Sequence, residues 1–251
     1  MRAPRSRSTA RELRASSGPD PEAADERPHP PGPESDWEES WWFDFTAADP
    51  TGPAGAVVGG FARLGLWANR GTAWYWAALV GDGRRYLLVR DEDVPLPRPG
   101  RTEVRTAGLW SALECETPLD HWTIGLEAFA VALDDPTDAW GDERGDQVGL
   151  GFDLEWEAVD RPRPEPDTTG YRQSCRVTGE ILVGRDERFM IDGRGERAHR
   201  WGPADLPQAA PPLVPGQPSG AGHRAPIRGG GRRIAFVLVD GGWRAVPAAD
   251  E

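Results

Sequence analysis

The 251-residue sequence has no lysine, only two cysteines and no long apolar run, so all 29 basic residues are arginine. Without lysine there is no G-x-x-x-x-G-K-[ST] phosphate loop, and no G-x-S-x-G elbow of a serine hydrolase occurs either. Two cysteines cannot staple a chain of this length or complete a four-ligand zinc site. We expect Cys115 and Cys175 to be free thiols in a cytoplasmic protein.

No stretch of roughly 18 or more apolar residues is present, so we predict no transmembrane segment. The arginine-rich start is followed by no apolar stretch and does not resemble a secretory signal. The net charge of -12 argues against a nucleic-acid partner. Acidic residues at alternate positions, as in 153–157, fit a solvated sheet face better than a calcium site. We therefore predict no cofactor and no metal.

Proline and tryptophan divide the chain into three parts. Residues 1–36 and 203–251 hold 15 of the 25 prolines, whereas 11 of the 12 tryptophans lie between Trp37 and Trp201. Proline fixes φ and lacks a backbone N–H, so the flanks are poor candidates for helix or central strand. We predict a disordered extension over 1–36, one folded domain over 37–202 and a Pro/Gly-rich tail over 203–251. Residues 232–239 of the tail either add a strand to the main sheet or stay loose.

Alternation with a period of two dominates the folded domain. In 148–157 every second residue from Val148 to Trp156 is apolar, and glycines and acids occupy the other positions. One apolar and one polar face are typical of an antiparallel strand. In 74–80 both faces are apolar, so we expect that strand to be covered on both sides.

Turn-forming sequences separate the alternating segments. They predict an all-β fold, either an antiparallel lipocalin-like barrel or a strongly curved sandwich, with disordered termini. A barrel of this strand number can hold a small ligand. The expected strands are 40–46, 56–68, 72–80, 85–90, 102–106, 109–117, 121–133, 147–159, 171–183, 187–192 and 196–201.

Six short motifs resemble one family when they are taken in this order. They are ESWWFD (39–44), WYW (74–76), PLDHW (118–122), GLEAF (125–129), CRVTGE (175–180) and GERAHRWG (195–202). Together they resemble the first domain of bacterial proteins of the AttH-like and hydroxyneurosporene synthase (carotenoid 1,2-hydratase) group. The resemblance covers about 37–202 and implies a lipocalin-like barrel, which in that family is followed by a second barrel.

The most specific motif is the ending His199-x-Trp201-Gly202. In the family it usually reads Asp-His-(Ser/Asn)-Trp-Gly, whereas here Ala198 replaces the aspartate and Arg200 the small polar residue. The resemblance implies that His199 and Trp201 belong to an active site in the hydratase branch, where a carboxylic acid protonates an alkene. The tail would then be a remnant of the second barrel. One alternative is that the chain is a truncated, non-catalytic member of the family.

Two carboxylates interrupt apolar segments, Glu127 within 122–133 and Glu180 within 177–183. In an apolar cavity the pKa of a carboxyl group rises, and the group can act as a general acid. Hydration or cyclisation of an alkene requires such an acid, and His199 would assist it. The structural alternative is that both carboxylates face outward or pair with arginine.

The aromatic residues also have two interpretations. They line an internal pocket for a rigid apolar ligand, or they are ordinary core, because tryptophan buries a large area. Likewise, His199 is either a polar group at a barrel mouth or a hydrogen-bonded structural histidine. The candidate ligand-binding residues are Trp74, Trp76, Trp110, Trp122, His121 and Trp201.

These observations favour a protein that binds a hydrophobic small molecule, such as a terpenoid, a carotenoid or a steroid-like lipid. Its role would be accessory to isoprenoid or lipid metabolism. The alternative is a cofactor-free hydratase or cyclase that protonates an isoprenoid alkene through Glu127 or Glu180.

Overall fold

The structure is a computed structural model that describes residues 19–52, 54–81, 83–134, 138–139, 143–165 and 168–203, and the backbone of three strands within 224–247. In this part of the chain it contains strands and two short 3-10 turns, η1 (Ala23–Glu26) and η2 (Ala68–Arg70), and no α-helix. The predicted all-β, antiparallel fold is confirmed. No helix among the described residues is long and apolar enough to cross a membrane.

One antiparallel sheet of eleven strands forms the main domain. Its order is β4-β3-β2-β1-β11-β10-β8-β7-β6-β5, and β9 pairs with β10. Along the chain the strands are β1 (Trp37–Ala48), β2 (Val57–Trp67), β3 (Thr72–Gly81), β4 (Leu87–Pro95), β5 (Glu103–Thr106), β6 (Leu109–Thr117), β7 (His121–Leu133), β8 (Gly145–Ala158), β9 (Arg163–Pro164), β10 (Gly170–Val183) and β11 (Glu187–Pro203).

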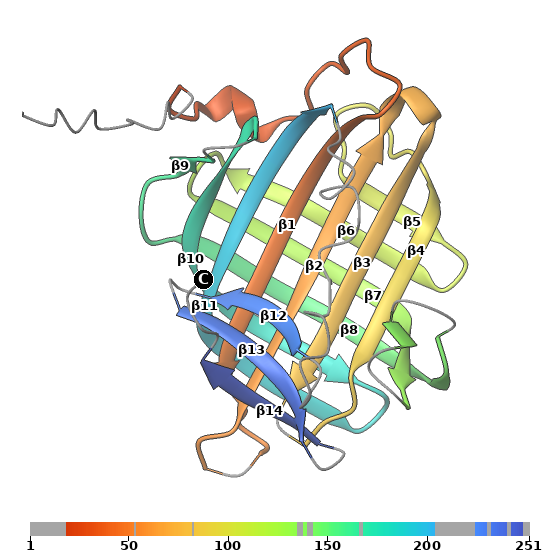
Figure 1. Cartoon of the computed structure of the whole chain (residues 1–251), viewed down its shortest axis with the longest axis vertical. Helices are drawn as coiled ribbons and strands as arrows, with labels where there is room; N and C mark the ends of the chain where they lie inside the picture. Colours follow the sequence, from red (N-terminus) through yellow and green to blue (C-terminus); the bar gives the residue numbers. More distant parts are fainter. Residues whose placement is uncertain are drawn as a thin grey trace, which may run out of the picture.

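The sheet closes on itself through β7. Most of β7 pairs with β6, while its end pairs with β4 through Leu87↔Ala132 and Leu88↔Val131. Eight strands thereby form a ring, and the β5–β6 hairpin extends beyond it. The ring is flattened into two layers, with β1–β4 and β11 crossing over β5–β8 (Figure 1). The fold therefore combines features of the predicted barrel and the predicted curved sandwich.

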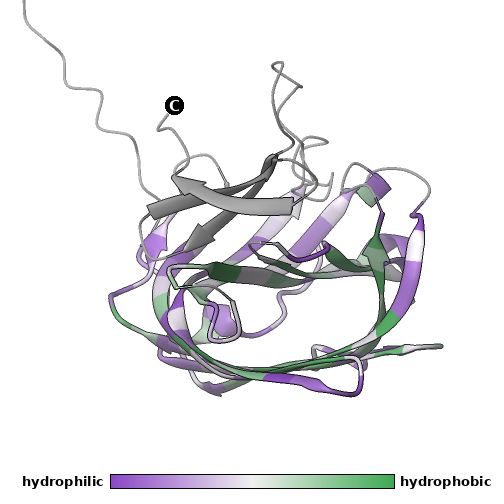
Figure 2. Cartoon of the chain, turned by 90° about the horizontal axis from the view of Figure 1, so that it is seen from below, coloured by the Kyte–Doolittle hydropathy of each residue, from purple (hydrophilic) through white to green (hydrophobic). Residues whose placement is uncertain are grey.

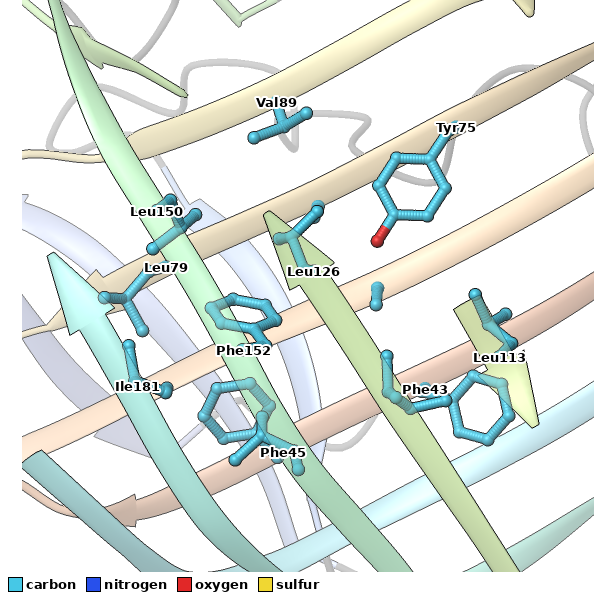
Figure 3. Packing of buried hydrophobic residues seen from close by; sticks show 14 of the residues in the cluster. Phe43, Phe45, Tyr75, Leu79, Val89, Leu113, Leu126, Leu150, Phe152 and Ile181 are labelled. Carbon is cyan, nitrogen blue, oxygen red and sulfur yellow. The ribbon is translucent and has the colours of Figure 1, made fainter. Parts of the chain in front are cut away.

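The interior of the ring is filled by side chains. Hydrophilic and hydrophobic residues alternate along the strands that surround it (Figure 2). Apolar side chains from both layers point toward one another, including Phe45 of β1, Tyr75 of β3 and Phe152 of β8 (Figure 3). The apolar face of 148–157 is buried as predicted, because alternation places every second side chain inside.

Strand β3 is covered on both faces, as its sequence predicts. Tyr75 and Leu79 belong to the interior core, whereas Trp74 and Trp76 belong to a second buried cluster with Phe61 on the outside of the ring. The prediction that Trp74 and Trp76 line an internal pocket is therefore wrong. Both faces of this strand are apolar, so periodicity alone does not tell which one looks inward.

Several predicted boundaries need correction. Segments 187–192 and 196–201 form a single strand, β11. They are continuous because Gly195 allows close approach to β1: a Cβ there would lie 2.3 Å from the carbonyl oxygen of Asp44.

Residues 232–239 do not join the main sheet. They form β13 (Arg232–Val239), which pairs with β12 (Arg224–Gly229) and β14 (Gly242–Pro247) in a three-stranded sheet.

The predicted disorder of 1–36 is wrong for residues 19–36, which pack against one end of the ring as described below. Residues 1–18 and 204–223 lie outside the described residues.

Candidate functional site

Residues 19–36, here called the strap, cover one end of the ring. Their anchor is Glu26, which lies in η1 and is 4% exposed. Its carboxylate accepts hydrogen bonds from Arg197 (2.6 and 3.1 Å), from Trp122 Nε1 (3.0 Å) and from the backbone N–H of Leu119 (2.8 Å). One side chain thus ties the strap to the ends of β7 and β11.

The local sequence explains how the strap is shaped. Glu22 and Asp25 form a reciprocal capping box around η1. The proline-rich segment 28–33 that follows cannot continue the turn, so it runs extended across the end of the ring. Asn69 of η2 holds it there by donating to the carbonyl oxygens of Gly32 (2.8 Å) and Glu34 (2.6 Å).

Beside Glu26 lies a cluster of three residues, His29, Glu39 and His199, here called the His–Glu–His cluster, in which Glu39 and His199 are buried and His29 is partly exposed. Glu39 Oε1 lies 2.7 Å from His29 Nδ1 and 2.9 Å from His199 Nε2. His199 is fully buried, and its Nδ1 donates to the carbonyl oxygen of Asp25 (2.7 Å). The cluster therefore joins β1, β11 and the strap.

Aromatic rings enclose the cluster. The ring of His29 stacks on Trp201 at 3.9 Å between centroids, and that of His199 stacks on Trp41 at 4.5 Å. His199 and Trp201 share one face of β11 because they are two residues apart, as the sequence predicts. The surrounding rings limit access of water to Glu39.

Charge in this cluster is set by mutual hydrogen bonding. Burial raises the pKa of Glu39, but the bonds from His199 and His29 outweigh it, so the net pKa is lowered. Burial lowers the pKa of His29, but the bond to Glu39 outweighs it, and the net pKa is raised. The arrangement can hold a proton, or another cation, between imidazole nitrogens and a carboxylate.

A second buried carboxylate, Glu165, is the partner of Arg200, the residue between His199 and Trp201. It accepts bonds from Arg200 (2.5 and 2.7 Å), from Arg172 (2.5 Å) and from Thr168 (2.9 Å). Arg200 also stacks on Trp42, with its guanidinium 3.9 Å from the ring centroid. Burial alone would raise the pKa of Glu165, but the bonds from Arg200 lower it to about 2.

The two candidate acids lie outside the ring. Glu127 is exposed on the outer face of β7. Glu180 lies on the outer face of β10 and forms an ion pair with Arg188 of β11. Neither carboxylate is in an apolar cavity. Both face outward, and Glu180 also pairs with an arginine, which is the structural alternative given for them above.

The candidate ligand-binding residues are scattered. Trp122 points into the interior, and Trp201 lies at the His–Glu–His cluster. Trp110 lies on the outer face, where its Nε1 donates to Glu103 (3.1 Å). His121 is also on the outer face, with Nε2 3.7 Å from Glu155. The structure therefore brings only His199, Trp201 and, through Glu26, Trp122 to one end of the ring.

Sequence reasoning missed Glu26, His29, Glu39 and Arg197. The only available signal was an acidic and histidine-containing sequence in the proline-rich segment, and composition favoured disorder there.

A pocket of about 450 Å³ lies at the other end of the ring. The residues that line the pocket show that it lies opposite the strap. The strap covers the start of β7 and the end of β11, whereas the pocket is lined by Ala132 at the end of β7 and Glu187 at the start of β11. The lining residues, which include aliphatic side chains continuous with the core, are Leu79, Gly83, Arg84, Arg85, Leu87, Ala132, Asp146, Gln147, Val148, Val183 and Glu187. We call it the mouth pocket.

The comparison with protein families gives one match, to the model described as "Domain of unknown function (DUF7064)", over residues 22–213. The chain belongs to the DUF7064 family. No curated protein and no solved structure matches the chain.

The residues that the DUF7064 model matches include nearly all of the strap as well as the ring. The match begins at Glu22, the first residue of the capping box, and runs through all of β1–β11. Residues 22–36 of the strap are therefore part of the DUF7064 domain, while β12–β14 lie beyond it.

Proposed function

We propose that the protein binds a neutral, apolar small molecule in the mouth pocket. The observation that carries the proposal is the pocket itself, whose volume of about 450 Å³ lies in the range of sites for drug-sized ligands. Its inner wall is aliphatic, with Leu79 and Leu87 almost completely buried and Val148 and Val183 partly so. Such a wall favours a terpenoid or steroid-like lipid, because burying apolar surface supplies the binding free energy.

The charges at the rim favour a neutral ligand over an anionic one. Arg84 is paired with Asp49 (2.8 Å) and Glu187 (2.5 Å). Arg85 is paired with Asp134 (2.6 Å) and Asp146 (2.8 Å). A ligand carboxylate would have to displace these partners, so a fatty acid is a poorer candidate than an alcohol or a hydrocarbon.

The alternative of an alkene hydratase or cyclase has less support. It requires a carboxylic acid inside an apolar cavity, and its candidates Glu127 and Glu180 both lie on the outer face. We therefore propose binding rather than catalysis. The proposed role is accessory to lipid or isoprenoid metabolism.

The proposal is tested by titrating the full chain with retinol, a sterol and a sesquiterpene alcohol while following Trp fluorescence and, for retinol, ligand fluorescence. Val183 faces the pocket, whereas its neighbour Leu182 is exposed on the outer face of the same strand. We expect Val183→Trp to fill the pocket and weaken binding at least tenfold, and Leu182→Trp to bind like the wild type. Failure of all three ligands to bind, or equal binding by both variants, would overturn the proposal.

A further inference from the structure

We propose that His29, Glu39 and His199 form a binding site for a divalent transition-metal ion, with zinc the best match. The candidate ligand atoms, one from each residue, all lie within 4.8 Å of one another. Two imidazoles and one carboxylate are a ligand set that zinc uses where a fourth position is left to water. The proposed site departs from the expectation, based on cysteine content and acidic stretches, that the chain binds no metal.

The hydrogen bond of His199 selects the nitrogen that would bind the metal. Its Nδ1 lies 2.7 Å from the carbonyl oxygen of Asp25, which can only accept, so Nδ1 carries a proton. In the neutral ring the lone pair is then on Nε2, which faces Glu39 Oε1 at 2.9 Å. A backbone carbonyl that orients a histidine in this way is the usual outer partner of a metal ligand.

His29 is oriented differently. Its Nδ1 lies 2.7 Å from Glu39 Oε1, and its Nε2 lies 3.6 Å from the carboxylate of Asp25, an ion-pair distance rather than a hydrogen bond. Two ring nitrogens thus converge on one carboxylate oxygen, and the same carboxylate accepts hydrogen bonds from the backbone N–H of His29 (2.9 and 3.0 Å). A single divalent ion can satisfy all three atoms at once.

All three separations between the ligand atoms would change when the ion binds. Zinc binds nitrogen and oxygen at about 2.0–2.2 Å in a tetrahedron, which places neighbouring ligand atoms about 3.3 Å apart. The two nitrogen–oxygen separations of 2.7 and 2.9 Å would open by roughly half an ångström. The two ring nitrogens, which lie within 4.8 Å of each other, would move toward the same spacing of about 3.3 Å. His29 can move most easily, because its side chain is 21% exposed while those of Glu39 and His199 are at most 1% exposed.

The position of the ligands gives the metal a structural consequence. His29 belongs to the strap, whereas Glu39 and His199 belong to β1 and β11 of the ring. The ion would therefore fasten the strap to the ring. This site lies at the end opposite the mouth pocket, so it is independent of the function proposed there.

The experiment uses the full chain after treatment with a chelator. We expect zinc titration by calorimetry to give one site per chain, and cobalt(II) to give the intense visible bands of a four-coordinate site. The melting temperature should rise with zinc concentration, because the ion binds only the folded state.

Variants assign the site. We expect His29→Ala and Glu39→Gln to weaken zinc binding at least tenfold. His121→Ala should bind like the wild type, since His121 lies on the outer face of β7. Circular dichroism confirms that each variant is folded, and the cobalt spectrum of the unaltered chain tests the site without any substitution. No saturable zinc binding by the wild type, or equal binding by the His29 and His121 variants, would overturn the proposal.

Discussion

At the scale of single residues, Glu165 is a buried carboxylate held by two arginines from different strands, Arg172 of β10 and Arg200 of β11. Arg200 also stacks on Trp42, so its guanidinium has both a charged and an aromatic partner. Two neighbouring residues of β11 thus have different structural partners. Arg200 shares Glu165 with Arg172 near the start of β10, and His199 contacts Asp25 of the strap.

Replacing Glu165 with glutamine should destabilise the fold in a pH-dependent way. The folded-state pKa of about 2 lies below the ordinary value of 4.5. Ionised Glu165 therefore stabilises the fold above about pH 4.5, and this contribution is lost as the pH falls toward 2. We expect Glu165→Gln to lower the free energy of unfolding by about 3 kcal/mol at pH 7, with a smaller difference at pH 3.

Urea denaturation at pH 7, 5 and 3 measures this difference. Glu127→Gln serves as the control, because Glu127 is exposed and should change stability little at any of these pH values. A Glu165 variant with the same deficit at pH 7 and pH 3 would contradict the electrostatic explanation.

At the scale of elements, the strap differs most from its sequence-based prediction. Proline content correctly indicates that 28–33 forms neither helix nor strand. It does not reveal whether the side chains around it find partners, and the partner of Glu26 is 171 positions away in the chain. Disorder and a docked extended segment therefore look alike in composition.

The strands themselves were predictable because alternation is a local property. The apolar face of 148–157 and the double covering of 74–80 follow directly from the residues. The direction in which a face points depends on the closure of the ring. For this reason Trp76, predicted to line an internal pocket, lies outside the ring, and of the two placements left open for Glu127 the outward one is found. Within the candidate site, His199 and Trp201 were predicted, whereas Glu39 and His29 required the fold.

Glu26→Gln should release the strap. The substitution leaves Arg197, which is 2% exposed, without a charged partner among the contacts described for it, and breaking a buried pair of this kind costs about 3–5 kcal/mol. Opening the strap restores water to both groups, so we expect faster amide hydrogen exchange over 19–36 rather than loss of the whole fold. Mass spectrometry of exchanged peptides makes the measurement.

Glu34→Gln is the matched control for this experiment, because Glu34 lies in the same segment and is exposed. Unchanged exchange over 19–36 in the Glu26 variant would show that the ion pair does not hold the strap.

At the scale of the whole molecule, the ring depends on a short junction. Only two residue pairs join β4 to β7, compared with eleven between β1 and β11. Arg85 reinforces the junction by donating to the carbonyl oxygens of Ala132 and Leu133 and by pairing with Asp134 and Asp146. The junction also borders the mouth pocket, so its integrity should influence access to that pocket.

Arg85→Met should loosen this junction while the rest of the ring remains closed. We expect a loss of stability of about 1 kcal/mol, because the ion pairs are partly exposed, together with faster hydrogen exchange at the β4–β7 pairing. Arg105→Met is the control, since Arg105 is 72% exposed and lies outside the junction. Equal exchange in the two variants at Leu88 and Val131 would contradict this role.

The pairing of β1 with β11 also has a consequence for synthesis. The first strand of the ring to leave the ribosome has its final neighbour at the far end of the domain, since Trp37 pairs with Pro203. At translation rates of about 5–20 residues per second, β1 waits on the order of ten seconds or more with one edge unpaired. Until then its alternating aromatic residues have no completed interior to enter, and an exposed strand edge of this kind invites pairing with other chains. The nascent domain should therefore depend on chaperones most strongly between the emergence of β2 and that of β11.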